Sequence, residues 1–135
     1  MAFVVWGDEY KLNIAEIDAQ HKKLFEMVND LHSAIKTGKG RDLLGDILSK
    51  LLIYCDTHFI TEERYMKNYG YPEYIQHKKQ HDDLTRQTKD FHDKFKENNS
   101  DITLDLMDFL KNWLHNHILV VDKRFGLYLT ARGVK

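Results

Sequence analysis

Seven side chains of the types that bind metal ions lie in or close to positions where a helical chain should bury aliphatic residues. They are His21, His58, Glu62, His77, His81, His117 and Asp122. Apolar residues recur at helical spacing around them, and six of the seven fall within these apolar stripes. Burying an unpaired imidazole or carboxylate is costly, and a folded domain is stable by only about 5–15 kcal/mol. The pattern therefore predicts a buried cluster of side chains that bind a common partner.

Three groups of helix-breaking residues divide the chain into four long segments with helical periodicity. The breakers are Gly38-Lys39-Gly40, Gly70-Tyr71-Pro72 and Asn98-Asn99-Ser100. We expect an irregular arm at 1–16, helices at about 18–37, 41–69, 72–97 and 101–121, and a short helical tail at about 123–131. Short connections make successive helices antiparallel. The predicted fold is an all-α, antiparallel up-down four-helix bundle, formed by a single domain of residues 1–135.

The distance of each candidate ligand from the nearest turn predicts that all seven lie at one depth in the bundle. His21 lies 18 residues before a turn at residue 39, and His58 lies 19 residues after it. The candidate pairs of the second and third helices lie 11 and 8 residues from the turn near residue 71, a difference of about 4–5 Å along the axis. From the turn at residue 99, the third-helix pair and the midpoint of His117 and Asp122 are 20 and 20.5 residues away.

The spacing within each helix also favours one shared site. The pairs on the second and third helices are four residues apart, which separates their side chains by about 40° around the helix axis. His117 and Asp122 are five residues apart, and an ideal α-helix would turn them away from each other by about 140°. We therefore expect a π-type bulge or a helix end between them, a distortion that is common at functional sites.

The ligand types favour transition metals. Five imidazoles and two carboxylates exceed the four ligands of a closed zinc site and lack the oxygen majority that Ca²⁺ and Mg²⁺ prefer. Two ions that share the carboxylates would use all seven side chains. Imidazole suits iron, copper, nickel and zinc, and of these we favour iron.

Composition restricts the partners and the compartment. Lys and Arg total 20 against 21 for Asp and Glu, without a basic stripe, so we expect no nucleic-acid partner. No apolar run approaches the ~20 residues that cross a bilayer, so we expect no membrane insertion. The single cysteine, Cys55, agrees with a reducing compartment, and we expect a cytoplasmic monomer in which Cys55 is a small buried core residue.

Four further polar residues are interpreted as lying outside the site. His32 and His92 are expected to face solvent, since each is about 11 residues from the candidate ligands of its own helix. His115 is expected to be a surface residue or a contact of the arm. Glu63 is rotated by about 100° from the stripe that holds Glu62, so we expect it to form a surface ion pair with a Lys or Arg. Aromatic and aliphatic residues of the arm, namely Phe3, Val4, Trp6 and Tyr10, are expected to hold it against the bundle.

Three segments of the chain resemble the motifs of the bacterial hemerythrins. They are IDAQHKKLF, HFITEERYMKNYGYPEYIQHKKQH and WLHNHILVVDKRF, and the resemblance extends from about Trp6 to Leu129. It implies a non-haem centre of two Fe ions, bridged by oxide or hydroxide, that binds O₂ reversibly. It further implies that His77, His81 and His117 hold one iron, that His21 and His58 hold the other, and that Glu62 and Asp122 bridge the two.

In this arrangement the iron held by two histidines would keep one coordination position vacant, because it has one protein ligand fewer than the other iron. The following residues are expected to line an O₂ pocket there: Leu24, Phe25, Phe59, Trp113, Leu114 and Ile118. We therefore expect an oxygen carrier, store or sensor rather than an enzyme. Two alternatives are a di-iron enzyme that reduces peroxide or nitric oxide, and a module for iron storage or iron sensing.

Overall fold

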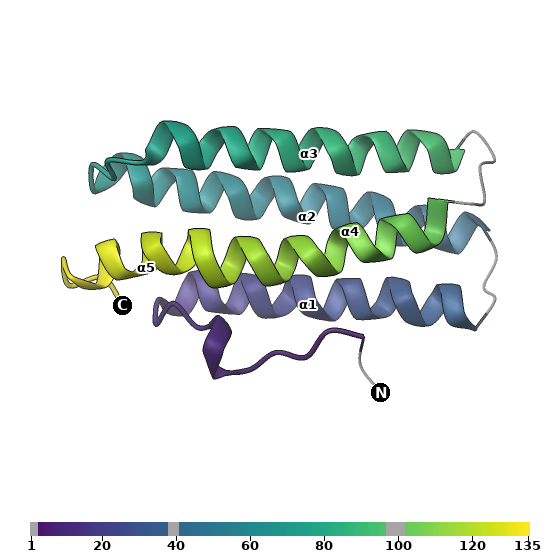
Figure 1. Ribbon diagram of the computed structural model, residues 1–135, viewed down its shortest axis with the longest axis horizontal. Coiled ribbons are helices and arrows are strands. Elements are labelled where there is room, and N and C mark those ends of the chain that lie inside the picture. Colours follow the sequence, from purple (N-terminus) through teal and green to yellow (C-terminus); the bar gives the residue numbers. More distant parts are fainter. Residues whose placement is uncertain (1–2, 38–40, 97–101) are drawn as a thin grey trace.

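Antiparallel helices account for most of the chain in the computed structural model, which describes residues 3–37, 41–96 and 102–135 (Figure 1). The elements are a 3₁₀ turn at Asp8–Tyr10, α1 at Ala15–Lys36, α2 at Arg41–Asn68, α3 at Tyr74–Lys96, α4 at Ile102–Asn116, a π-helical segment at His117–Asp122, and α5 at Lys123–Thr130. Each long helix packs against the next, and α4 also packs against α1, which closes the bundle. The described residues include no β-strand, and the predicted all-α four-helix bundle is confirmed.

The connection between α2 and α3 is one of the expected turns. Gly70 has a positive φ of 63°, and the N–H of Tyr71 donates to the carbonyl of Met66 at 2.9 Å, a pattern that ends helices with a left-handed glycine. Pro72 lies in this turn rather than in the first turn of α3, which begins two residues later. The other two expected turns, at 38–40 and 98–100, lie outside the described residues.

The first part of the arm is held by hydrogen bonds and by ring stacking. The Asn29 side chain bonds both backbone groups of Val4, accepting from its N–H and donating to its carbonyl, each at 2.9 Å. Phe3 stacks on the ring of His32, with ring centroids 4.3 Å apart. The expectation that His32 faces solvent was therefore wrong: the arm covers its ring, and His32 is half-buried.

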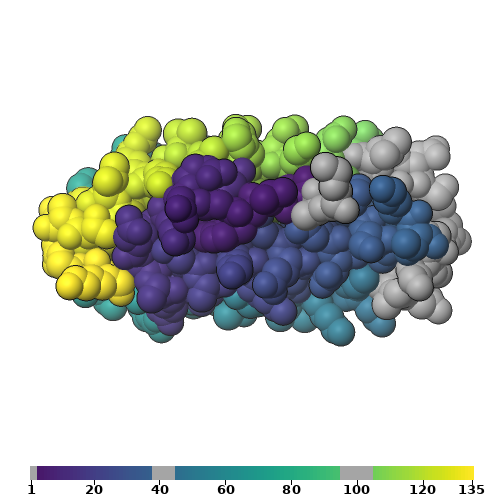
Figure 2. All heavy atoms as spheres, turned by 90° about the horizontal axis from the view of Figure 1, so that it is seen from below, coloured from purple at the N-terminus to yellow at the C-terminus, as the bar shows by residue number. Residues whose placement is uncertain are grey.

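The second part of the arm packs on an aromatic residue of α1. The rings of Trp6 and Tyr10 meet Phe25 edge to face, at centroid distances of 5.3 and 4.7 Å. His115 of α4 lies 3.4 Å from the Tyr10 hydroxyl through its Nδ1, so it is a contact of the arm. Figure 2 shows the arm lying across the surface between the N-terminal helix and the C-terminal part of the chain.

The arm enters α1 through a tight bend. Asn13 has a φ of 65°, a left-handed conformation that asparagine tolerates better than most residues. The Asp18 carboxylate accepts the N–H groups of Leu12 and Asn13 at 2.7 and 3.0 Å, which ties the bend to the first turn of the helix. A Cβ added to Gly126 of α5 would lie 2.7 Å from Leu12 Cγ, so this glycine lets the arm approach closely. Together these contacts fix the start of α1.

Apolar residues fill the core on both sides of the histidines. Towards one end the fully or almost fully buried side chains include Leu31, Leu48, Leu51, Leu106 and Leu110; towards the other they include Ile14, Ile17, Met66, Phe125 and Leu129. Cys55 is buried among them, as expected, and burial raises the pKa of its thiol to about 12. The expectation that His92 faces solvent was wrong. Its Nε2 pairs with the Ser49 hydroxyl at 2.8 Å, between α2 and α3.

Candidate metal centre

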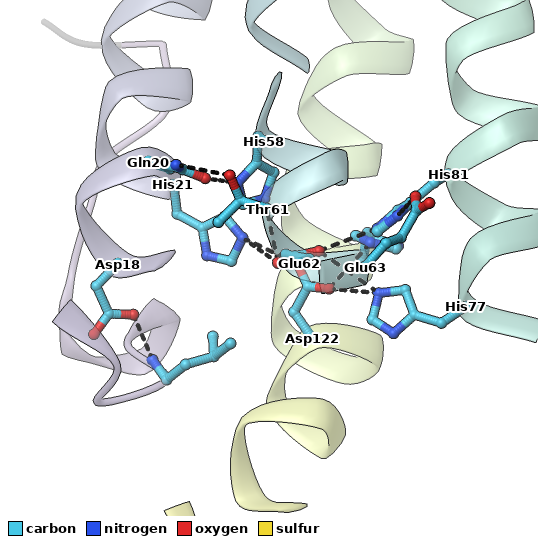
Figure 3. A network of polar contacts seen from close by, with 12 residues as sticks. Asp18, Gln20, His21, His58, Thr61, Glu62, Glu63, His77, His81 and Asp122 are labelled. Atoms are coloured by element: carbon cyan, nitrogen blue, oxygen red, sulfur yellow. Dashed lines mark hydrogen bonds and ion pairs between the residues drawn. The ribbon is translucent and has the colours of Figure 1, made fainter. Parts of the chain in front are cut away.

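Seven histidine and carboxylate side chains meet in one layer inside the bundle, all of them buried. His21 comes from α1, two residues each come from α2 and α3, and His117 and Asp122 stand at the two ends of the π-helical segment. The π distortion expected from the five-residue separation is confirmed, and it brings Asp122 back to the face that His117 occupies. Figure 3 shows the imidazoles of α1, α2 and α3 pointing towards Glu62 and Asp122.

One oxygen of each carboxylate faces the two histidines on α1 and α2. The Nε2 atom of His21 lies 3.2 Å from Glu62 Oε2 and 3.1 Å from Asp122 Oδ2. The Nε2 atom of His58 lies 3.2 Å from the same Glu62 oxygen. These four residues offer ligand atoms that all lie within 4.8 Å of one another.

The other oxygen of each carboxylate faces the remaining three histidines. Asp122 Oδ1 lies 2.9 Å from His77 Nε2 and 3.1 Å from His117 Nε2. Glu62 Oε1 lies 3.1 Å from His81 Nε2. These five residues also offer ligand atoms within 4.8 Å of one another, so Glu62 and Asp122 belong to both groups.

The short distances in the three-histidine group are not hydrogen bonds. Within the described part of the chain, the buried Nε2 atoms of His77, His81 and His117 have no hydrogen-bond partner. The same is true of Glu62 Oε1 and of both Asp122 oxygens. Lone pairs that converge without pairing are costly when buried, unless a cation lies between them. The donor set thus fits two metal ions that share both carboxylates, and its imidazole majority suits transition metals.

The charges of the metal-free cluster are strongly coupled. Burial opposes protonation of His21 and His81, but the neighbouring carboxylates prevail and raise the pKa of each imidazole to about 9: Asp122 and Glu62 act on His21, and Glu62 and Glu63, with the more distant charge of Asp122, act on His81. Burial would raise the pKa of Glu62 and Asp122, yet the surrounding imidazoles hold both well below their usual values. Two imidazolium ions therefore face two carboxylates at neutral pH. Protons and metal ions compete for the same lone pairs.

Two side chains that pair with an outer imidazole nitrogen of the cluster were not identified from the sequence. The Gln20 carbonyl oxygen lies 2.7 Å from His58 Nδ1, and a Glu63 oxygen lies 3.1 Å from His81 Nδ1. The expectation that Glu63 pairs with a Lys or Arg was wrong, because the packing of α2 on α3 turns this side chain towards an imidazole. Each of the two directly precedes or follows a cluster residue in the sequence, which was the only available signal.

The six residues expected to line an O₂ pocket are all buried, being at most 8% exposed. Phe59 stacks on His81 with ring centroids 4.0 Å apart and an interplanar angle of 9°. Trp113 stacks on His117 at 5.8 Å and meets Phe59 edge to face. These two aromatic residues thus pack on the three-histidine group. Leu24 and Phe25 follow His21 by one helical turn; Leu114 lies one turn before His117, and Ile118 follows it directly. The role of the set as a pocket wall stays a prediction.

No helix within residues 3–37, 41–96 and 102–135 is long and apolar enough to cross a membrane.

Comparison with known proteins assigns the chain to a family. The family described as hemerythrin HHE cation binding domain matches residues 12–127. A bacteriohemerythrin of Methylococcus capsulatus is 38% identical over 132 residues, which cover 97% of this chain and 100% of that protein. A bacteriohemerythrin of Stenotrophomonas maltophilia is 34% identical, covering 93% of this chain and 81% of that protein. A crystal structure of wild-type hemerythrin superposes with a TM-score of 0.88 at 37% identity and covers 95% of this chain and 98% of its own. The chain, with its buried metal-binding cluster of histidines and carboxylates, belongs to the hemerythrin family.

Proposed function

We propose that this chain binds O₂ reversibly at a centre of two iron ions, as an oxygen carrier, store or sensor. The observation that carries the proposal is the division of the carboxylate oxygens. Glu62 and Asp122 each direct one oxygen to a group with two histidines and the other to a group with three. A pair of ions held in this way would be bridged by both carboxylates, and the two ions would differ by one protein ligand.

The difference of one ligand assigns separate roles to the two groups. His77, His81 and His117 with the two bridges supply five donors, whereas His21 and His58 with the same bridges supply four. A small ligand would therefore bind on the side of α1 and α2. Iron in a set of neutral imidazoles supplies the reversible change of oxidation state that O₂ binding needs.

The surroundings of the two-histidine group favour a site that releases its ligand unchanged. Leu24 and Phe25 on α1, Leu114 on α4 and Ile118 in the π segment are between 0 and 2% exposed. In our proposal these apolar side chains exclude water and proton donors from the bound O₂. The names of the relatives, bacteriohemerythrin and hemerythrin, support the same assignment.

Reconstitution with Fe²⁺ tests the proposal. The metal-free protein would be loaded without air and its iron content measured, and absorption spectra would be recorded before and after exposure to O₂ and again after its removal. We expect two irons per chain and a visible band that appears and disappears over repeated cycles. Sustained turnover of peroxide or nitric oxide with a reductant would instead indicate the enzyme, and rapid loss of iron to a chelator would indicate the store. One metal per chain, or a preference for zinc in iron-rich medium, would contradict the two-iron centre.

A further inference from the structure

The two groups of the metal centre differ in the residue that contacts the outer nitrogen of one imidazole in each. His58, in the two-histidine group, has the neutral amide of Gln20 at its Nδ1. His81, in the three-histidine group, has the carboxylate of Glu63 at the same position. Figure 3 shows the two contacts on opposite sides of Glu62. One group is thus supported by a dipole and the other by a negative charge.

The orientation of the Gln20 amide follows from a chain of hydrogen bonds that starts at the backbone. The Thr61 hydroxyl donates to the Thr57 carbonyl at 3.1 Å, so its oxygen is free to accept a bond. The Gln20 amide nitrogen donates to that oxygen at 3.3 Å, which turns the Gln20 carbonyl towards His58 Nδ1 at 2.7 Å. His58 must then carry its proton on Nδ1. Its Nε2 lone pair is left for the centre.

Glu63 fixes His81 in a similar way, but with a charge. An ionised carboxylate only accepts hydrogen bonds, so the proton of a neutral His81 lies on Nδ1, 3.1 Å from the Glu63 oxygen. The Glu63 side chain is only 17% exposed, which limits screening by water. A carboxylate behind a ligating imidazole strengthens that imidazole as a donor to a metal, and the loss of such a partner typically weakens metal binding by about 10–100-fold.

We propose that Gln20 and Glu63 are positioning residues that make the two metal positions unequal. Glu63 strengthens the three-histidine position, which therefore fills first and empties last; Gln20 orients His58 without adding charge, which leaves the two-histidine position the more labile. This inference rests on the proposed centre of two metal ions. It concerns how far the two positions differ in metal release beyond the difference of one protein ligand, and which residues cause that difference.

Release of Co²⁺ to an excess of chelator tests the inference without O₂ chemistry. Co²⁺ takes the same donor types, and its visible absorption reports how much remains bound. Four variants are informative: Glu63→Gln keeps an acceptor but removes the charge, Glu63→Ala removes both, Gln20→Ala removes the acceptor, and Gln20→Glu adds a charge. Glu73→Gln is the matched control, because Glu73 contacts Tyr71 and Arg124 rather than an imidazole. Circular dichroism of each metal-free variant would check folding.

We expect the parent to release two Co²⁺ ions in two phases, with one ion released in each phase. Glu63→Ala should quicken the slow phase alone by about 10–100-fold, and Glu63→Gln should do so by a smaller factor. Gln20→Ala should quicken the fast phase alone, and Gln20→Glu should slow it. Unchanged phases in both Glu63 variants, or a variant that shifts both phases equally while folded, would overturn the inference. Binding of fewer than two ions by the parent would instead contradict the proposed two-metal centre.

Discussion

Metal affinity should depend steeply on pH because two protons occupy the metal-free centre. The carboxylates of Glu62 and Asp122 raise the pKa of His21 and His81 from an ordinary 6.5 to about 9, so both imidazoles are protonated at pH 7–8. A metal ion needs their neutral form. Filling the centre therefore displaces about two protons between pH 7 and 8, and the overall affinity for two ions should rise by about 100-fold per pH unit.

The sign of the dependence follows from the direction of the two pKa shifts. Because both values are raised, the protonated form persists at neutral pH and competes with the metal. Above pH 9 the imidazoles lose these protons without metal, so the dependence should flatten there. His58 contributes no proton in this range, since burial lowers its pKa, with His21 adding to the effect against the pull of Glu62.

Competition with a chelating dye, whose own pH dependence is known, measures the overall Co²⁺ affinity at each pH. His115→Gln is the control, because His115 contacts Tyr10 of the arm and lies outside the cluster. Its Co²⁺ affinity should rise with pH as steeply as that of the parent. If the logarithm of the overall affinity rises by less than one per pH unit between pH 7 and 8, the reasoning is refuted. Such a result would mean that His21 and His81 are already neutral in the metal-free protein at this pH.

Three further predictions concern the centre and its surroundings. Asp122→Ala removes a carboxylate shared by both groups, so metal content should fall below two ions per chain by elemental analysis; a content of two would exclude Asp122 as a bridge. Removing metal should lower the melting temperature of the parent, and the metal-free form should lose further stability as pH rises from about 6.5 to about 9, because its imidazolium–carboxylate pairs lose their charge; equal melting temperatures with and without metal, or a metal-free form whose stability is constant over this range, would contradict this. Leu114→Ala and Ile118→Ala should each lower the free energy of unfolding by about 2–5 kcal/mol and should quicken loss of the oxygenated absorption while iron content stays constant. Decay rates equal to the parent's in both variants would remove these residues from the proposed pocket wall.

The convergence of the cluster could be anticipated because it depends on residue counts. Antiparallel helices with short connections place residues at equal distances from a turn at equal depth, and His21 and His58 obey this rule. The π segment followed from a similar count, since no regular α-helix directs both His117 and Asp122 to one point. These inferences need only helix geometry and the positions of the breakers.

The partners of the imidazoles could not be anticipated, because they depend on how far each helix is rotated against its neighbour. Glu63 lies about 100° from Glu62 around α2, and the apolar stripe alone does not say whether that direction faces solvent or α3. Gln20 raises the same question on α1. His92 shows the dependence in its plainest form: its partner, Ser49, is 43 residues away on another helix. Such contacts become visible only when the helices are docked.

The π segment also sets which changes this stretch tolerates, because it holds one residue more than an α-helix would need. On α2 and α3, candidate ligands that are four residues apart point to the same site. In the π segment a separation of five residues achieves this, because the wider turn absorbs one residue. Val120, 57% exposed within the segment, can change identity without altering the phase between α4 and α5. Its deletion would leave an ordinary helix with the pair four apart, whereas one more inserted residue would swing Phe125 and Leu129 about 100° away from the core. Exposed positions of the segment such as Val120 can therefore be substituted freely, whereas buried Ile118 cannot, and an inserted residue would not be tolerated.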